Sequence, residues 1–323
     1  MISSQVGPFA ISSDIALPLA HGSSPDDKAA VRSVSLTQGP VPDALDDPIW
    51  ESGPIQVTDR RFLFRLPTGL AYLLEDGQAV TYDYQGEGEL SEKDVQLFFL
   101  GPVFGALCAQ HNLLPLHASS LRHKHAPEKL FGFTGHSGAG KSTMGAAFTQ
   151  RGFELFSDDI LVLDPTSATE QQCYRGHKGS KLWIDAVDHF ALDKGERISR
   201  LSDREKYYVG QDVDGAMGRA QLDGLYFLHH ESNAKVGANI MIFRRDDIHA
   251  IKLFHDGLYR PLLIEAIMGR RALYQGLAQL AETIPLYVVH RPFHKEDIDR
   301  CVDMIVEHLT APVDVGVPDL PNM

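Results

Sequence analysis

The stretch that decides the fold is Gly135-His136-Ser137-Gly138-Ala139-Gly140-Lys141-Ser142, near the middle of the 323-residue chain. It fills every specified position of the pattern G-x-x-x-x-G-K-[ST]. Glycines at this spacing let the backbone turn so that successive N–H groups face phosphate oxygens, and the positive end of a following helix adds to that field. The motif therefore predicts a loop for the phosphates of a nucleoside triphosphate. Lys141 would lie on the β- and γ-phosphates and the Ser142 hydroxyl on Mg²⁺.

The flanking sequence supplies the strand and the helix that such a loop requires. Residues 130–134 are an apolar run that predicts a buried strand, and residues 141–150 have the pattern of an amphipathic helix. Gly152 suits the position just after that helix. His136 occupies a freely variable position of the motif, so we assign it no role beyond its place in the loop.

A pair of carboxylates, Asp158-Asp159, follows shortly after the helix. Such a pair commonly marks a turn or a solvated surface, but its flanks are apolar, which favours a continuous strand over residues 154–163. A strand would place the two side chains on opposite faces. One could hold Mg²⁺ and the other could accept a proton from an attacking hydroxyl. An aspartate at the metal would serve an ATPase equally well, so the pair alone does not establish a kinase.

The N-terminal part of the chain, up to about residue 90, is predicted to be β-rich. Residues 9–12 and 31–36 alternate apolar with small or polar side chains at the period of a strand. The apolar runs 62–66 and 71–74 flank Pro67-Thr68-Gly69, which predicts a hairpin.

A helix is predicted to open after Ser91, a suitable N-cap, and can run as far as His111 with a kink at Pro102. The chain is thus expected to divide into a β-rich domain (1–90), a domain that contains the phosphate loop (91–311) and a loose, proline-rich tail (312–323). The remaining predicted elements are strands over 117–121, 225–228 and 240–243, helices over 261–282 and 295–309, and loops or turns over 21–30 and 123–129.

Composition and charge narrow the class of function. The net charge is −13 and no basic run occurs, so neither nucleic acid nor a membrane is an expected partner. Cys108, Cys173 and Cys301 are too few and too widely spaced for a disulfide framework or a zinc site. The sequence shows no signal peptide and no apolar run long enough for a transmembrane helix. We therefore expect a cytoplasmic protein.

Three segments together resemble the HPr serine kinase family: His117-Ala118-Ser119-Ser120, the loop from Gly135 to Thr143, and Arg151-Gly152 through Asp158-Asp159. The resemblance is closest to the HPr-kinase-related proteins of bacterial biosynthetic operons, including lasso peptide clusters. It covers residues 97–165 and weakens beyond them. It implies an α/β (α+β) fold with a P-loop kinase core of the HPr kinase and phosphoenolpyruvate carboxykinase-like type, preceded by a β-rich N-terminal domain.

The resemblance also implies roles for individual residues and the cofactors ATP and Mg²⁺. Asp159 aligns with the catalytic base of the family, Lys141 holds the phosphates, and His117 lies at the active site. Ser142 and Asp158 are the implied metal residues. The implied nucleotide-binding residues are Gly135, His136, Ser137, Gly138, Ala139, Gly140, Lys141, Ser142 and Thr143.

The sequence departs from the family at one motif. HPr kinases carry a Glu-x-Arg-Gly segment that supplies a metal-binding Glu. The most similar segment of this sequence is Cys173-Tyr174-Arg175-Gly176, which lacks the acid. The second metal contact, a phosphorylase activity and HPr itself as substrate therefore stay open. Lys206 and Arg260 are candidate cationic groups for the transferred phosphate or the substrate.

The leading hypothesis from sequence is an ATP-dependent kinase that acts on a hydroxyl, with a serine of a peptide, such as a lasso-peptide-type precursor, as the preferred acceptor. Free serine or another small hydroxyl compound, and an HPr-type protein, are alternative acceptors. A nucleotide-gated regulatory ATPase is a further alternative. A nucleotide-binding subunit without turnover is disfavoured by the intact Gly140-Lys141-Ser142 and Asp158-Asp159. HPr kinases are hexamers, so the resemblance makes a homo-oligomer one possibility, but no sequence feature identifies that interface and the oligomeric state stays open.

Overall fold

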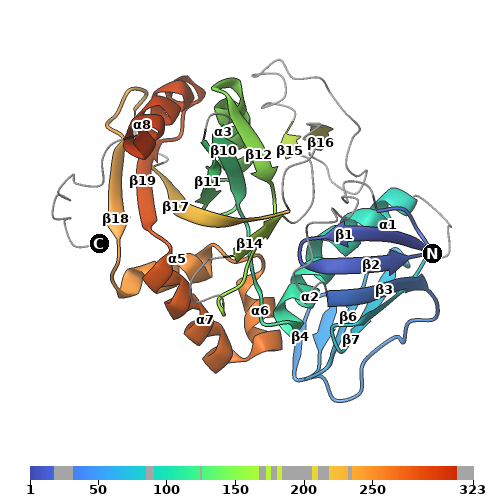
Figure 1. Ribbon diagram of the computed structural model, residues 1–323. Helices are drawn as coiled ribbons and strands as arrows, with labels where there is room; N and C mark the ends of the chain where they lie inside the picture. The colour runs from blue at the N-terminus through green and yellow to red at the C-terminus, as the bar shows by residue number, and fades with distance from the viewer. Residues whose placement is uncertain are drawn as a thin grey trace.

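Two β-sheets, each covered by helices, organise the protein (Figure 1). The computed structural model describes residues 1–17, 32–84, 91–123, 126–166, 172–175, 180–183, 206–209, 218–231 and 235–310. The loop predicted over 21–30 and the tail over 312–323 lie outside these residues. Within the described ranges, no helix combines the length and apolar character that crossing a membrane requires. The expected mixture of helices and strands is confirmed.

The N-terminal part of the chain forms an eight-stranded sheet in the order β1-β2-β3-β8-β7-β6-β5-β4. Its strands are β1 (Ile2–Val6), β2 (Phe9–Ser13), β3 (Arg32–Gln38), β4 (Trp50–Ser52), β5 (Ile55–Val57), β6 (Arg61–Arg65), β7 (Ala71–Glu75) and β8 (Ala79–Asp83). Strands β6 and β7 pair antiparallel, which confirms the predicted hairpin. Buried and more exposed residues alternate along β2, so the side chains on one face of the sheet are covered and those on the other are more exposed.

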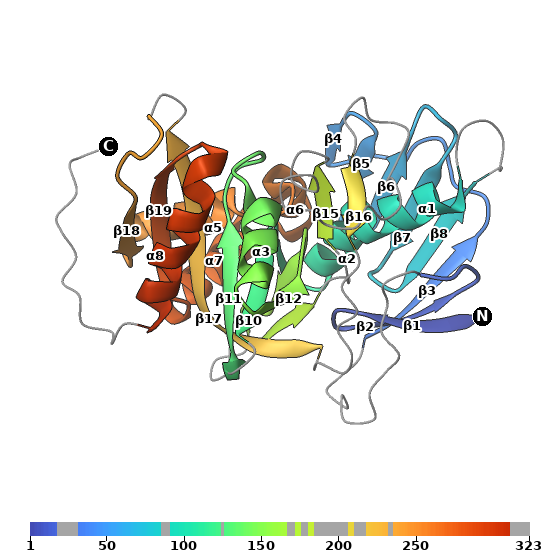
Figure 2. The same cartoon turned by 90° about the horizontal axis from the view of Figure 1, so that it is seen from above.

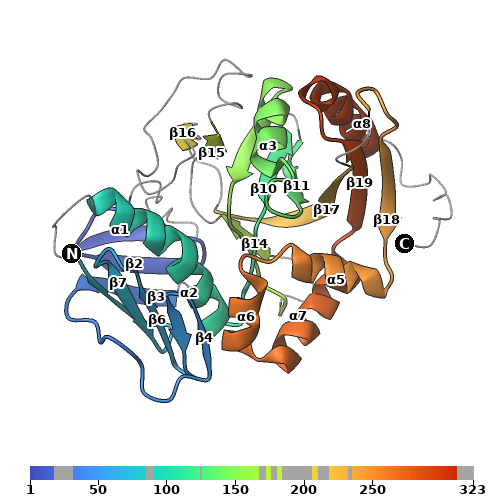
Figure 3. The same cartoon turned by 180° about the vertical axis from the view of Figure 1, so that it is seen from behind.

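Three consecutive helical segments pack against this sheet: α1 (Glu92–Phe98), the π-helical turn η1 (Phe99–Val103) and α2 (Phe104–Gln110) (Figure 3). Ser91 is the N-cap of α1, as predicted. Pro102 lies inside η1, and because proline has no N–H to donate, the helix is disturbed there rather than ended. The rings of Phe9 and Phe104 meet edge to face at 5.9 Å. The sheet and these helices share one core, so the division near residue 90 stays a prediction.

The second sheet has nine strands and carries the glycine-rich loop. Its strands are β9 (Leu114–Leu116), β10 (Ser119–His123), β11 (Ala126–Thr134), β12 (Phe153–Ser157), β13 (Leu161–Leu163), β14 (Gln172–Arg175), β17 (Arg219–Glu231), β18 (Met241–Arg245) and β19 (Leu286–Pro292). Strand β17 first pairs with β14 and then lies between β11 and β19, parallel to both. A separate two-stranded sheet pairs β15 (Ser180–Trp183) with β16 (Lys206–Val209).

Helices cover both faces of this second sheet (Figure 2). Helices α3 (Lys141–Gln150) and α8 (Ile298–Thr310) lie on one face, and α5 (Ile248–Asp256), α6 (Pro261–Met268) and α7 (Arg270–Thr283) lie on the other. On β11, Phe131 and Phe133 belong to the core under α3 and α8, whereas Leu130 belongs to the opposite core. Successive side chains of a strand point to opposite faces, so this alternation shows that β11 is buried on both sides. Helix α2 lies against α6, which joins the two sheets.

Several elements differ from the predicted ones. The stretch 123–129 is largely strand rather than turn, because β11 already begins at Ala126. The helix predicted over 261–282 is two helices, since Gly269 has a φ of 76°, a value that an α-helix cannot contain. The C-terminal helix is preceded by a short 3-10 turn, η2 (Lys295–Asp297). Helix α5 and strand β19 have no counterpart among the predicted elements.

Candidate functional site

The glycine-rich loop connects the end of β11 at Thr134 to the start of α3 at Lys141, so the predicted strand and helix are both confirmed. Gly135, Gly138 and Gly140 have φ values of 142°, 84° and 90°. Residues with a side chain rarely adopt such values, so the glycines are needed for the path of the loop. The tip of the loop is exposed, with His136, Ser137 and Gly138 at the surface, while Ala139 is buried beneath it.

Of the three glycines in the loop with positive φ, Gly135 is the one at which an added Cβ atom would meet backbone. A Cβ atom there would lie 2.7 Å from the carbonyl oxygen of Leu228, whereas a Cβ atom at Gly138 would meet no atom within 4 Å. We expect Gly135→Ala to lower the free energy of unfolding by about 1–3 kcal/mol and to remove ATP binding, because backbone must shift to relieve the clash. Gly138→Ala is the matched control: it has an unfavourable φ without a clash, at a cost of about 1 kcal/mol. Thermal unfolding with and without ATP measures both effects, and equal behaviour of the two variants would contradict this account.

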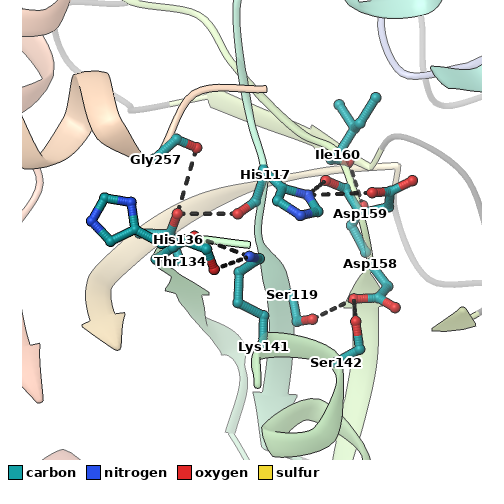
Figure 4. Close-up of polar contacts among 12 residues, drawn as sticks. His117, Ser119, Thr134, His136, Lys141, Ser142, Asp158, Asp159, Ile160 and Gly257 are labelled. Carbon is teal, nitrogen blue, oxygen red and sulfur yellow. Dashed lines mark hydrogen bonds and ion pairs between the residues drawn. The ribbon is translucent and has the colours of Figure 1, made fainter. Parts of the chain in front are cut away.

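The Lys141 side chain folds back over the loop (Figure 4). Its Nζ donates hydrogen bonds to the carbonyl oxygens of Gly135, at 3.0 Å, and of His136, at 3.1 Å. The residue is 6% exposed, so the loop holds the ammonium in one place. A buried positive charge enclosed by the loop is the arrangement expected for a group that binds phosphate.

The carboxylate pair lies in a turn and not in a strand, so the predicted strand over 154–163 is wrong. Strand β12 ends at Ser157 and β13 begins at Leu161, and Asp159 between them has a φ of 72°. Aspartate adopts the left-handed conformation more readily than most residues, because its short side chain bonds to the local backbone. The Ser157 hydroxyl donates to the carbonyl oxygen of Ile160 at 2.7 Å and fixes the turn. The two carboxylates therefore do not sit on opposite faces of one strand.

Asp158 is brought together with Ser142, the other predicted metal residue. The Ser142 hydroxyl donates to Oδ1 of Asp158 at 3.2 Å, and the Ser119 hydroxyl donates to the same oxygen. Asp158 is 1% exposed, so its carboxylate is buried against α3 and β10. Carboxylate and hydroxyl oxygens are the ligands that Mg²⁺ takes, together with phosphate oxygens and water. In the described part of the chain no three His, Cys, Asp or Glu side chains gather into a metal cluster, so phosphate would have to supply further ligands.

His117 lies beside Asp159, the residue that the resemblance aligns with the catalytic base, and the active-site role of His117 stays a prediction. Its Nδ1 is 2.9 Å from the carbonyl oxygen and 3.3 Å from Oδ1 of Asp159 (Figure 4). The backbone N–H of His117 donates to the carbonyl oxygen of Gly257 at 2.8 Å, and the Thr134 hydroxyl donates to the carbonyl oxygen of His117 at 3.1 Å. These bonds fix the backbone at His117, and the Nδ1 contacts hold its imidazole against Asp159, which is partly exposed.

Of the two candidate substrate cations, Arg260 lies near this group. It is the exposed N-cap of α6, its guanidinium is 5.8 Å from the centre of the Tyr259 ring, and that ring meets the His117 ring edge to face at 6.0 Å. Lys206 opens β16, and its side chain lies outside the described residues. Their roles at the substrate stay predictions.

Strand β14, which carries Cys173 and Arg175, pairs with the strand that follows the acidic turn. Arg175 on β14 pairs with Leu161 on β13, and Leu161 is two positions after Asp159. The buried guanidinium of Arg175 is 4.9 Å from the centre of the Phe156 ring. Burial lowers the pKa of Arg175 to about 10, with the Arg122 guanidinium as the next cause. Cys173 is buried on the same strand.

Arg291, on β19, supports the loop and carries no motif that would reveal it in the sequence. It is 5% exposed, and its Nη2 donates to the carbonyl oxygen of Ala139 at 2.7 Å. A Cβ atom at Gly140 would lie 2.7 Å from the same nitrogen, and the φ of 90° adds backbone strain, so a side chain there would displace Arg291. Burial lowers the pKa of Arg291, but the guanidinium stays charged at neutral pH.

We expect Arg291→Met to weaken ATP binding by about tenfold, the effect of losing one hydrogen bond from a charged group at about 1.5 kcal/mol. Arg291→Lys should recover part of the affinity, because an ammonium can still donate to the Ala139 carbonyl. Calorimetric titration with Mg·ATP measures both variants. Unchanged affinity in Arg291→Met would show that the loop keeps its shape without this contact.

Comparison with known proteins gives a limited result. The chain matches no known protein-family model and no curated protein. Among solved structures it is similar to the Hpr(Ser) kinase/phosphatase from Coxiella burnetii, with 13% sequence identity and a TM-score of 0.30. That match covers 60% of this chain and 95% of the other.

Proposed function

We propose that this protein is an ATP-dependent kinase that transfers the γ-phosphoryl group to a hydroxyl. One observation carries the proposal: the buried Lys141 ammonium, the Ser142–Asp158 contact and the His117–Asp159 pair converge around one glycine-rich loop. A phosphate-binding loop alone would fit any nucleotide-binding protein. A second carboxylate, held by an imidazole next to the first, adds a group that can accept a proton.

The loop and Lys141 would hold the phosphates, with the backbone N–H groups and the start of α3 adding positive potential. Ser142 and Asp158 fit Mg²⁺, which would neutralise charge on the phosphates when bound. Catalysis of this kind comes mainly from positioning and charge stabilisation. The burial of Lys141 and Asp158 suits that requirement, because buried groups are held in fixed positions and act at low dielectric.

Asp159 would take the proton of the acceptor hydroxyl as the new oxygen–phosphorus bond forms and the bond from the γ-phosphorus to the β-phosphate oxygen breaks. ADP leaves with the electron pair of that bond, and the proton is passed on to solvent. Asp159 is the more exposed member of the pair, with 20% of its side chain accessible, so an acceptor can reach it. His117 is a positioning residue, because its Nδ1 contacts both the carbonyl and the carboxylate of Asp159.

For the acceptor we propose the serine of a peptide, on the resemblance to the kinases of biosynthetic operons. Free serine, another small hydroxyl compound and an HPr-type protein are the other acceptors to be tested. An exposed arginine near the site, Arg260, is a candidate contact for an anionic part of the acceptor or for the transferred phosphate.

The test is an acceptor screen. The protein is incubated with Mg·ATP and, in separate reactions, a serine-containing peptide, free serine or an HPr-type protein, and mass spectrometry follows the gain of one phosphate. We expect one acceptor class to gain phosphate and to accelerate ADP formation. If ADP forms at the same rate with and without every acceptor, the kinase proposal is wrong and a regulatory ATPase is favoured.

A further inference from the structure

The carboxyl ends of four strands meet at one edge of the second sheet. Strands β11, β17 and β19 are parallel, and β12 runs in the same direction because both β12 and β11 are antiparallel to β10. The acidic turn follows β12 and the glycine-rich loop follows β11. The ends of β17 and β19 therefore lie on the opposite side of the loop from the acidic turn. Ligands of open α/β sheets bind along such an edge.

An exposed aromatic ring stands at the β17 and β19 end of this edge. Phe293 directly follows β19 and is 48% exposed. Its ring lies 4.4 Å from the His230 ring, centre to centre, at an interplanar angle of 31°. A Cβ atom at Gly140 would lie 3.9 Å from the Phe293 ring, so the ring adjoins the last glycine of the loop.

The polarity of a bound nucleotide follows from the proposed function. The Ser142–Asp158 contact and Asp159 place the γ-phosphate end beside the acidic turn. With the phosphates held in the loop, a nucleotide of this polarity would extend its nucleoside toward the ends of β17 and β19, on the other side of the loop. Phe293 is the large exposed aromatic residue on that side, among the described residues.

We propose that Phe293, backed by His230, stacks on the base of the bound nucleotide. This proposal rests on the proposed nucleotide function and adds the part of the site that binds the base. Arg291 lies on the same strand end, with its guanidinium 5.6 Å from the centre of the Phe293 ring, and so links the base platform to the loop. Every base has an aromatic face, so stacking of this kind favours nucleotides over simple phosphates without strong selection of one base.

The Phe293 ring and the His230 ring behind it form the base platform, and a neutral His230 suits their packing better than a charged one. Burial lowers the pKa of His230, and the nearby Arg291 guanidinium, His229 and His136 lower it further. The lowered pKa favours the neutral imidazole, which packs tilted against the Phe293 ring. Phe293 itself has no polar atom to satisfy, so its replacement should change the surface without changing the fold.

The test compares two ligands that share a triphosphate, Mg·ATP and Mg·tripolyphosphate, by calorimetric titration. We expect Phe293→Ala to weaken ATP binding by about 5- to 150-fold, the range that loss of one base–aromatic stack produces, and to leave tripolyphosphate affinity unchanged. Phe293→Trp should keep ATP affinity. Tyr274→Ala is the control for loss of an exposed aromatic ring, because Tyr274 is 37% exposed on α7 and packs against His255.

Each other outcome overturns a different part of the proposal. An equal loss for ATP and tripolyphosphate would mean that Phe293 supports the loop and does not contact the base. Unchanged ATP affinity in Phe293→Ala, with the wild type binding ATP, would refute the stacking alone. If the wild type binds neither ligand, the nucleotide function itself is wrong and the stacking proposal falls with it.

Discussion

Asp159→Asn should lower the rate of phosphoryl transfer sharply while ATP still binds. Asparagine keeps the size and the hydrogen-bonding oxygen of the side chain but cannot accept the proton of the acceptor hydroxyl. Loss of a general base lowers the rate by about 10²- to 10⁴-fold. The residue adopts the left-handed region, φ 72°, and asparagine is well tolerated there, so the turn should keep its shape. Single-turnover phosphorylation of the acceptor and calorimetric ATP titration measure the two effects separately.

Asp164→Asn is the matched control for this variant. Asp164 lies just after β13, at the opposite end of that strand from the acidic turn, and accepts hydrogen bonds from the backbone N–H and hydroxyl of Thr166. It should transfer phosphate at the wild-type rate. Full activity of Asp159→Asn would remove the base role, and a parallel loss of ATP binding would show that Asp159 acts on the nucleotide instead.

Lys141→Ala should remove nucleotide turnover and weaken ATP binding in the same variant. The loop encloses the ammonium, and its contacts with the Gly135 and His136 carbonyls keep it in place. Loss of one such stabilising group costs about 10²- to 10³-fold in rate. ADP formation at saturating acceptor, over a range of ATP concentrations, gives both kcat and KM.

The control for charge is Lys252→Ala. Lys252 is 72% exposed on α5 and pairs with Asp256, so its removal changes the net charge equally without touching the loop. Wild-type turnover in Lys141→Ala would show that ATP is not bound at this loop. A change confined to thermal stability would give Lys141 a structural role only.

The loop and its helix could be predicted from sequence because their determinants are local. The glycines, the apolar run before them and the residues after Lys141 fix strand, loop and helix within a short stretch, and α3 spans the predicted residues 141–150. The hairpin of β6 and β7 was equally local, with the turn residues between two apolar runs. The order of strands in both sheets depends on contacts between distant segments, and no local pattern encodes it.

The acidic turn shows where local pattern misleads. Apolar residues on both sides of Asp158-Asp159 have the composition of a strand, yet they belong to two different strands. Strand β12 pairs with β10, whereas β13 pairs with β9 and β14, so the chain must change partners at the pair. The bond from Ser119 to Asp158 and the left-handed Asp159 accommodate that change.

Two further parts of the site could not be predicted because they come from β17 and β19. Arg291 meets the loop at Ala139 although 152 positions separate them. Phe293 reaches Gly140 and His230 in the same way. A lone arginine or phenylalanine at the end of an apolar run has no distinguishing pattern. Only the parallel pairing of β11, β17 and β19 brings these side chains to the loop.

The fate of the γ-phosphoryl group in ¹⁸O-labelled water tests the central claim most directly. Transfer to a hydroxyl forms a phosphoester whose phosphate carries no oxygen from solvent, whereas hydrolysis releases inorganic phosphate with one ¹⁸O atom. With the acceptor present, we predict an unlabelled phosphoester as the main product, and its loss in Asp159→Asn. Recovery of all γ-phosphate as ¹⁸O-labelled inorganic phosphate, whichever acceptor is added, would contradict the account.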